Sequence, residues 1–197
     1  MTKKYIVAVD EAGRGPLAGP VTIAAVAAKS TRLNRVLKDI KDSKKLSPKK
    51  REEWYKIITE NFECKTASVG PKIIDKLGIN KAINLAVQRV LPRIFDHFSD
   101  VARPKRAKAV ILLDGLLRAP KHYDQQTIIK GDEKIPIISA ASIIAKVTRD
   151  RKMLRLHKKF PQYSLDKHKG YGTKLHYKMI RKYGLCEIHR KSYRKKL

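Results

Sequence analysis

Cysteine is scarce in this sequence of 197 residues: only Cys64 and Cys186 are present. Two thiols so far apart cannot build a disulfide framework, and their spacing matches no zinc-binding pattern. We therefore expect two reduced structural thiols and no zinc site.

Long apolar runs are missing as well. The first apolar run covers only residues 5–9 and is followed by charges, which is too short for a signal peptide or a bilayer-spanning segment. The sequence shows neither a lipidation signal nor an exposed amphipathic helix, so it gives no indication of attachment to a membrane surface. We expect a cytoplasmic protein that does not contact membranes.

Acidic residues are few relative to basic ones. The chain has 18 Asp and Glu against 46 Lys and Arg, which gives a formal net charge of +28. A charge of this size predicts a polyanionic partner, because bound phosphates release condensed counterions. With a membrane surface disfavoured, nucleic acid is the expected partner. The 42% of hydrophobic residues suffices for the core of a domain.

Apolar runs alternate with helical patterns along the chain. Ser47 followed by Pro48 is typical of a helix start, and Pro92 is expected to bend a later helix. Strands are predicted at 5–9, 21–28, 66–69 and 109–113, with a shorter apolar run at 127–129, and helices at 48–61, 80–95 and 139–160. This alternation predicts an α/β fold. We expect one domain over 1–197, with an α/β core to about residue 160 and a basic helical portion over 161–197.

Carboxylates follow three of the apolar runs: Asp10 with Glu11, then Asp114, then Asp132. Sites of α/β proteins are usually assembled at strand ends. Converging carboxylates are stabilised by divalent cations, and ligands that offer only oxygen suit Mg²⁺ or Mn²⁺. Two such ions can activate a water and stabilise the leaving oxygen of a phosphodiester. The pattern therefore suggests metal-assisted hydrolysis of nucleic acid.

The same acids have a simpler interpretation. An acid after a strand is often a helix cap, a turn former or an ion-pair partner. Adjacent strand residues also point to opposite faces, so Asp10 and Glu11 reach one site only if the strand twists or ends there. The residues alone therefore leave two hypotheses open, a metal-dependent nuclease and a non-catalytic basic nucleic-acid-binding protein.

Six segments spread over nearly the whole chain decide between these hypotheses. They are residues 10–20 (DEAGRGPLAGP), 42–47 (DSKKLS), 113–115 (LDG), 130–132 (KGD), 138–150 (ISAASIIAKVTRD) and 168–173 (HKGYGT). In this order they resemble the signature blocks of the ribonuclease HII family. The resemblance implies a ribonuclease H-like fold, with a central mixed sheet, flanking helices and a helical C-terminal region.

The resemblance also implies an activity and a metal site. The catalytic, metal-binding set would be Asp10, Glu11, Asp114 and Asp132, with Mg²⁺ or Mn²⁺ and two ions during catalysis. The substrates would be RNA–DNA hybrids and duplex DNA carrying a single ribonucleotide. The cut would fall 5′ to the ribonucleotide and leave a 3′-hydroxyl and a 5′-phosphate, as ribonucleotide excision repair requires. A monomer is expected.

Contacts to the nucleic acid follow from the same resemblance. Gly13, Arg14 and Gly15 match a loop whose backbone senses the ribose 2′-hydroxyl, the group that distinguishes RNA from DNA, although an ordinary tight turn predicts the same glycines. Tyr171 matches a tyrosine that stacks on the sugar beside the RNA–DNA junction, although by itself it would be a packed turn aromatic. Three basic residues match positions near the scissile phosphate and are expected to contact phosphates: Lys44, Lys146 and Arg149. The loop and Tyr171 argue against a related nuclease that acts on DNA alone.

Four positions need separate interpretation. Asp150 lies four residues after Lys146 in a predicted helix, where an ion pair is the simpler account, so Asp132 is preferred as the fourth ligand. His168 is interpreted as structural rather than catalytic. Leu116 stands where bacterial members of the family usually have Asn, so a polar contact beside Asp114 is expected to be missing. Residues 190–197 are interpreted as a disordered cationic tail.

Overall fold

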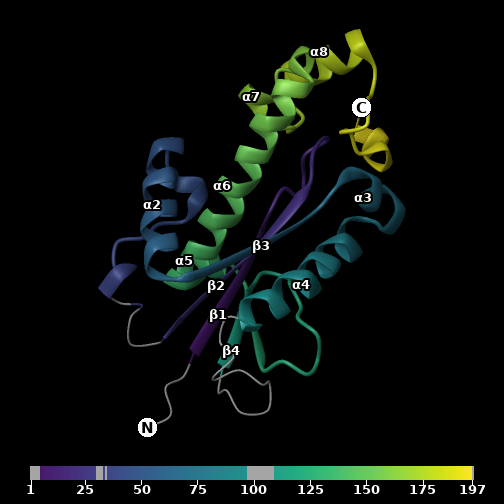
Figure 1. Cartoon of the computed structure of the whole chain (residues 1–197). Coiled ribbons are helices and arrows are strands. Elements are labelled where there is room, and N and C mark those ends of the chain that lie inside the picture. The colour runs from purple at the N-terminus through teal and green to yellow at the C-terminus, as the bar shows by residue number, and fades with distance from the viewer. Residues whose placement is uncertain (1–4, 30–32, 34, 97–108, 197) are drawn as a thin grey trace.

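A mixed sheet of five strands forms the centre of the molecule (Figure 1). The computed structural model describes residues 5–29, 33, 35–96 and 109–196. The strand order is β3-β2-β1-β4-β5; β1 pairs antiparallel with β2 and β2 with β3, whereas β1 pairs parallel with β4 and β4 with β5. The strands are β1 (Tyr5–Ala12), β2 (Val21–Lys29), β3 (Glu63–Val69), β4 (Ala109–Asp114) and β5 (Gln125–Ile128).

Helices cover both faces of the sheet (Figure 1). One face packs against α3 (Pro71–Leu77) and α4 (Ile79–Phe95), and the other against α2 (Pro48–Asn61) and α6 (Pro136–Lys159). The short helices η1 (Ser43–Lys45) and α5 (Gly131–Lys134) flank the latter face. The C-terminal portion adds η3 (Pro161–Tyr163), α7 (Leu165–His168), α8 (Lys174–Tyr183) and η4 (Lys191–Lys196). The predicted α/β fold, with a central mixed sheet flanked by helices, is confirmed.

Side-chain alternation along β1 fixes which residues meet which helices. Val7 and Val9 are buried in the cluster that contains α4, whereas Ala8 is buried in the cluster that contains α6. In β4, Leu113 belongs to the α4 side and Leu112 to the α6 side. Since successive strand residues point to opposite faces, the residues after Val9 and Leu113 point to the α6 side.

Most predicted elements agree with the structure. The helix predicted over 48–61 is α2, and the Ser47 hydroxyl accepts a hydrogen bond of 3.2 Å from the Lys50 amide as its cap. The predicted strands at 21–28 and 109–113 and the helix at 80–95 match β2, β4 and α4 to within one residue at either end. The long helix begins at Pro136, three residues before the predicted start at Ser139, because proline suits the first turn of a helix.

The first strand was predicted too short. It continues through Asp10 and Glu11 to Ala12, because these residues remain paired with β2 after the pairing with β4 has ended at Val9. From Asp10 onward the edge of β1 that faces β4 is no longer paired.

The interpretation of the last residues as a disordered tail is wrong for the part that the structure describes. Arg190 is only 1% exposed, and the amides of Lys191 and Ser192 each donate a hydrogen bond of 2.9 Å to the Asp75 carboxylate on α3. A carboxylate that accepts several such bonds holds a basic segment in place. Figure 1 accordingly shows the C-terminal end lying beside α3. Leu197 lies outside the described residues.

None of the helices in the described part of the chain is both long and apolar enough to span a bilayer.

A cluster of buried histidines holds the C-terminal helices together. The rings of His168 and His176 stack with centroids 4.2 Å apart, and the Nε2 atoms of His176 and His189 lie 3.2 Å apart. Burial lowers the pKa of all three rings, that of His176 from 6.5 to about 4. The cluster is therefore neutral at neutral pH.

This cluster predicts an acid-sensitive fold. A folded-state pKa below the unfolded value contributes stability above the unfolded pKa, and that stability is lost as the pH falls from 6.5 towards about 4. Thermal unfolding at about pH 7 and about pH 5 should show a fall in melting temperature. His176→Gln should reduce this fall, whereas His122→Gln, at an exposed position, should not. An equal fall in both variants would contradict the assignment.

Candidate active site

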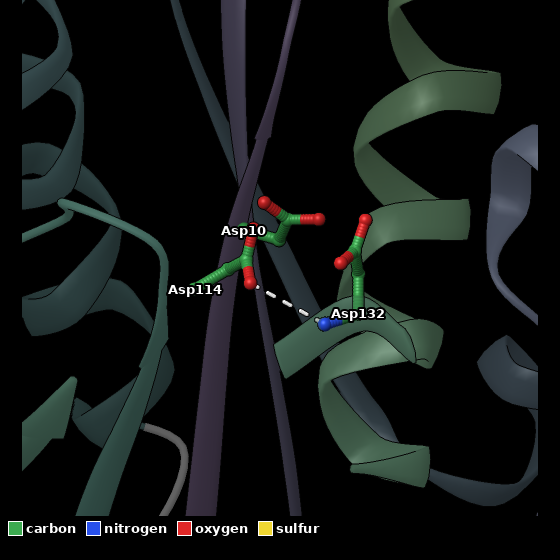
Figure 2. A group of neighbouring side chains, drawn as sticks. All are labelled: Asp10, Asp114 and Asp132. Atoms are coloured by element: carbon green, nitrogen blue, oxygen red, sulfur yellow. Dashed lines mark hydrogen bonds between the residues drawn. The ribbon is translucent and has the colours of Figure 1, made fainter. Parts of the chain in front are cut away.

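Three aspartates converge at one end of the sheet (Figure 2). Asp10 comes from β1, Asp114 is the last residue of β4, and Asp132 lies in α5. One carboxylate oxygen of each lies within 4.8 Å of the others. In Figure 2 the three side chains point toward one another.

Strand register brings Asp10 and Asp114 together. Val9 and Leu113 are the last parallel pair of β1 and β4, so the two aspartates follow at the same level. Both point to the α6 side, because their neighbours Val9 and Leu113 point to the α4 side. The sheet therefore places both carboxylates on one face.

Asp132 reaches the same place through a tight turn after β5. Lys130 adopts the left-handed conformation with φ 54°, after which the amides of Gly131 and Asp132 donate to Asp114 Oδ1 at 2.7 and 3.3 Å. A Cβ on Gly131 would lie 2.6 Å from Ile138 Cδ1 and 3.2 Å from Asp114 Oδ1, so a side chain there would displace Ile138 and crowd the Asp114 carboxylate. The turn thus couples the positions of Asp114 and Asp132.

The electrostatics of this group favour a bound cation. Burial, followed by the charges of Glu11 and Asp114, raises the pKa of Asp10 well above its ordinary value. Burial and the neighbouring Asp132 raise the pKa of Asp114. The Lys44 ammonium lies 2.7 Å from Asp132 Oδ2, and this hydrogen bond raises the pKa of Lys44. Three carboxylates with only oxygen donors fit a hard divalent cation such as Mg²⁺ or Mn²⁺.

Glu11 lies beside the three aspartates but does not belong to the group of carboxylates whose oxygens lie within 4.8 Å of one another. It follows Asp10 in β1 and so starts from the opposite face, as the alternation of a strand requires. Its Oε1 accepts a hydrogen bond of 3.0 Å from Arg14 Nε, while burial raises the pKa of its carboxyl. Glu11 nevertheless lines the same cavity. Its role as a metal ligand stays a prediction.

One cavity of about 250 Å³ brings nearly all predicted site residues together. Of the predicted residues, its walls include Asp10, Glu11, Gly13, Arg14, Gly15, Lys44, Asp114, Asp132, Lys146 and Tyr171. Asp10, Glu11 and the glycine loop are contiguous in the sequence, whereas the other acids, the lysines and Tyr171 are far from them, and the fold gathers all of them at one opening.

Tyr171 is an exposed aromatic side chain at this cavity. It is 41% exposed, and the Lys146 ammonium and Arg149 guanidinium each lie 5.5 Å from the centre of its ring. Its carbonyl oxygen lies 3.0 Å from His176 Nδ1. A partly exposed ring at the wall of the cavity is suited to stacking on a sugar or base.

Arg149 is the predicted site residue that the structure places elsewhere. Its side chain is fully buried, and its Nε and Nη2 donate to the carbonyl oxygens of Pro20 and Ala18 at 3.0 and 3.2 Å. The expectation of a phosphate contact is corrected, because a side chain used in this way faces the protein interior.

Three separate interpretations can be compared with the structure. Lys146 Nζ lies 2.9 Å from Asp150 Oδ1, so the predicted ion pair is confirmed. His168 is buried, with Nε2 2.9 Å from the Tyr163 carbonyl oxygen and Nδ1 accepting from the Gly170 amide at 3.1 Å, which confirms a structural role. Leu116 is 81% exposed and lines a separate pocket.

Some residues of the site were missed from the sequence. Ser43 and Ser142 line the same cavity as Asp10, and their hydroxyl oxygens lie 2.8 Å apart. Both serines lie inside segments 42–47 and 138–150, so those segments carried the signal. Arg190 was also missed, because it stands in a basic C-terminal stretch where nothing distinguishes it from its neighbours.

Sequence comparisons with known proteins agree on one family. The sequence model described as Ribonuclease HII matches residues 7–196. A ribonuclease HII of Caldicellulosiruptor bescii is 43% identical over 195 residues, which cover 98% of this chain and 88% of that protein. One of Fusobacterium nucleatum is 46% identical over 197 residues, covering 98% and 87%. The ribonuclease H2 structure from Pyrococcus horikoshii OT3 superposes with a TM-score of 0.70 at 27% identity, covering 97% of this chain and 96% of that one. The predicted ribonuclease H-like fold is thereby confirmed.

Proposed function

The chain belongs to the ribonuclease HII family, and we propose that it hydrolyses the RNA strand of RNA–DNA hybrids and nicks duplex DNA on the 5′ side of single ribonucleotides. The observation that carries the proposal is one cavity in which three convergent aspartates face a glycine loop and Tyr171. The aspartates provide for phosphodiester hydrolysis, and the loop and the aromatic ring for selection of the sugar.

The residues that would hold the metal are Asp10, Asp114 and Asp132, joined by Glu11 from the other face of β1. When bound, two Mg²⁺ or Mn²⁺ ions would supply an activated water and neutralise the departing 3′-oxygen of the phosphodiester. The products would be a 3′-hydroxyl and a 5′-phosphate. The Gly131 and Asp132 amides fix the Asp114 carboxylate, and the Lys44 ammonium limits repulsion at Asp132.

Selection of the substrate would begin with charge. A net charge of +28 attracts nucleic acid without regard to sequence, so the distinction between RNA and DNA must come from the cavity. Gly13 and Gly15 line it without side chains, and Tyr171 offers an exposed ring. These residues would read the 2′-hydroxyl, and Lys146 would contact a phosphate.

We also propose that the chain acts as a monomeric single domain in ribonucleotide excision repair. The C-terminal portion packs against the 13–15 loop through Arg190, which supports one folded unit. A nick beside a ribonucleotide is the step that allows its removal.

Cleavage of matched duplexes tests the proposal. With Mg²⁺ or Mn²⁺ the protein should nick a DNA duplex that carries one ribonucleotide, on its 5′ side, because only this duplex offers a 2′-hydroxyl to the loop. The all-DNA duplex of the same sequence should stay intact. Denaturing electrophoresis with end-labelled strands measures both. Cleavage of both duplexes, or of neither, would contradict the proposal.

The alternative of a non-catalytic nucleic-acid-binding protein explains the site less well. Convergent acids that are buried, with raised pKa values at Asp10 and Asp114, destabilise the fold and weaken attraction to phosphates. Such an arrangement suits a cation site rather than helix caps. Binding of both duplexes without cleavage would be the result that favours this alternative.

A further inference from the structure

Two arginines are buried beneath the loop that carries the glycines of the site. Residues 13–20 connect β1 to β2, and we call them the 13–20 loop. Arg149 comes from α6 and Arg190 from the chain between α8 and η4, and they are 0% and 1% exposed. Two elements far from the loop in sequence therefore reach under it.

Arg190 binds the backbone of the loop at three carbonyl oxygens. Its Nη2 donates to Gly13 at 2.6 Å, its Nη1 to Arg14 at 2.9 Å and its Nε to Gly19 at 3.0 Å. The Tyr193 hydroxyl also donates to the Arg14 oxygen, at 2.8 Å. A planar guanidinium can bind several carbonyls at once in fixed directions, which an ammonium cannot.

Arg149 supports the other end of the loop. Its Nε and Nη2 donate to the carbonyl oxygens of Pro20 and Ala18, and its guanidinium lies 5.5 Å from the centre of the Tyr171 ring. Its Nη1 is buried and has no hydrogen-bond acceptor among the described residues. Arg149 thus connects the loop to the aromatic side chain of the site.

The direction of these carbonyls fixes the direction of two amides. In a trans peptide the C=O and the following N–H point opposite ways. Because the Gly13 and Arg14 oxygens point at Arg190, the N–H groups of Arg14 and Gly15 point away from it. Neither amide donates to any group in the part of the chain that is described. Both residues line the cavity, so these donors are free for a ligand oxygen.

Burying two cations under one loop is costly. Burial lowers the pKa of Arg149 to about 10 and that of Arg190 below its ordinary value, yet both stay charged at neutral pH. Apolar residues of similar volume often stabilise a fold as well as buried charges do. The two buried charges are explained if they fix the orientation of the loop, because apolar residues would serve its packing equally well.

We propose that Arg149 and Arg190 are positioning residues that hold the 13–20 loop so that the Arg14 and Gly15 amides donate to the 2′-hydroxyl oxygen of a ribonucleotide. They would thereby set the preference for a ribonucleotide over a deoxyribonucleotide. This inference rests on the proposed function and adds residues that do not themselves touch the substrate.

Steady-state kinetics of Arg190→Lys and Arg149→Lys test the inference. The KM for a duplex with one ribonucleotide should rise about tenfold, as expected for lost charge-assisted hydrogen bonds, while kcat changes less. The inhibition constant of the all-DNA duplex should not change, because it has no 2′-hydroxyl. Arg155→Lys, an exposed position of the same helix as Arg149, is the matched control and should leave all three constants unchanged.

A merely structural role predicts a different pattern. Partial unfolding would lower kcat and leave KM and the inhibition constant unchanged, and this outcome would overturn the inference. If Arg190→Lys does not fold, Tyr193→Phe removes one hydrogen bond to the Arg14 oxygen and should raise KM about threefold; an unchanged KM would again overturn it. Failure of the proposed function is distinguishable, because the wild-type protein would then not distinguish the two duplexes.

Discussion

Asp10→Asn is expected to reduce nicking at a single ribonucleotide by at least about a thousandfold. Asp10 is adjacent to Glu11 in the sequence, and one of its carboxylate oxygens lies within 4.8 Å of oxygens of Asp114 and Asp132. Loss of its charge weakens any bound cation, and cations at such sites supply several kcal/mol of transition-state stabilisation. Binding of the duplex should be largely retained, because phosphates are held by basic residues. Single-turnover cleavage and a binding titration with the same duplex measure the two effects.

The same substitution should raise the melting temperature of the metal-free protein. Burial and neighbouring charges raise the pKa of Asp10, so the folded state loses stability as the pH rises through that pKa and the group ionises. Asn removes this charge and the repulsion with it. The increase in melting temperature that Mn²⁺ gives the wild-type protein should largely disappear, since a cation stabilises only the state that binds it.

Asp150→Asn is the matched control, since Asp150 is a partly buried aspartate that also lies within a family segment. Its carboxylate pairs with Lys146, and an ion pair of this kind contributes little, so cleavage should change by about twofold at most. Cleavage that survives in Asp10→Asn, or that disappears in Asp150→Asn, would show that the metal site has been placed wrongly.

Local patterns predicted most of the fold. The Ser47-Pro48 start and the helical spacing after it gave α2 its observed bounds, because capping and amphipathicity act within a few residues. The end of β1 is not predicted correctly, because it depends on a contact between residues that are distant in the sequence. Whether Asp10 and Glu11 stay in a strand depends on pairing with β2, a contact with residues 23 and 24 that the local sequence does not show.

The sequence predicts the residues that line the cavity, but it does not predict the contacts of residues buried beneath the 13–20 loop. Ten of the predicted residues line the cavity, because the family segments that contain them are recognisable. Arg149 was identified by its segment and given the wrong contact, since charge alone suggests a phosphate. Arg190 carries no local signal, because its burial, which leaves it only 1% exposed, depends on how α6, the 13–20 loop and the C-terminal chain pack together.

Gly13→Ala is expected to cost about 3 kcal/mol of folding free energy and most of the activity. Gly13 has φ +97°, a conformation that side chains rarely adopt, and a Cβ there would lie 2.1 Å from Arg149 Nε and 2.8 Å from the Pro20 oxygen. Either the loop or Arg149 must move, and Arg149 is held on both sides by loop carbonyls. Thermal or chemical denaturation, together with cleavage of the single-ribonucleotide duplex, measures both losses. An unchanged melting temperature would show that Arg149 is not fixed beneath the loop.

Gly15→Ala separates this packing requirement from an approach of the substrate. Two residues further along the same loop, a Cβ on Gly15 would meet no atom within 4 Å, and its φ lies outside the left-handed range. Stability should therefore change little, whereas a ligand that approaches the Gly15 amide would meet the new methyl group. We expect a wild-type melting temperature with a KM for the single-ribonucleotide duplex raised about tenfold, comparable to the loss of one hydrogen bond. Unchanged KM in this variant would mean that the open space above Gly15 is not where the ribonucleotide binds, so the two glycines would then serve only the turn.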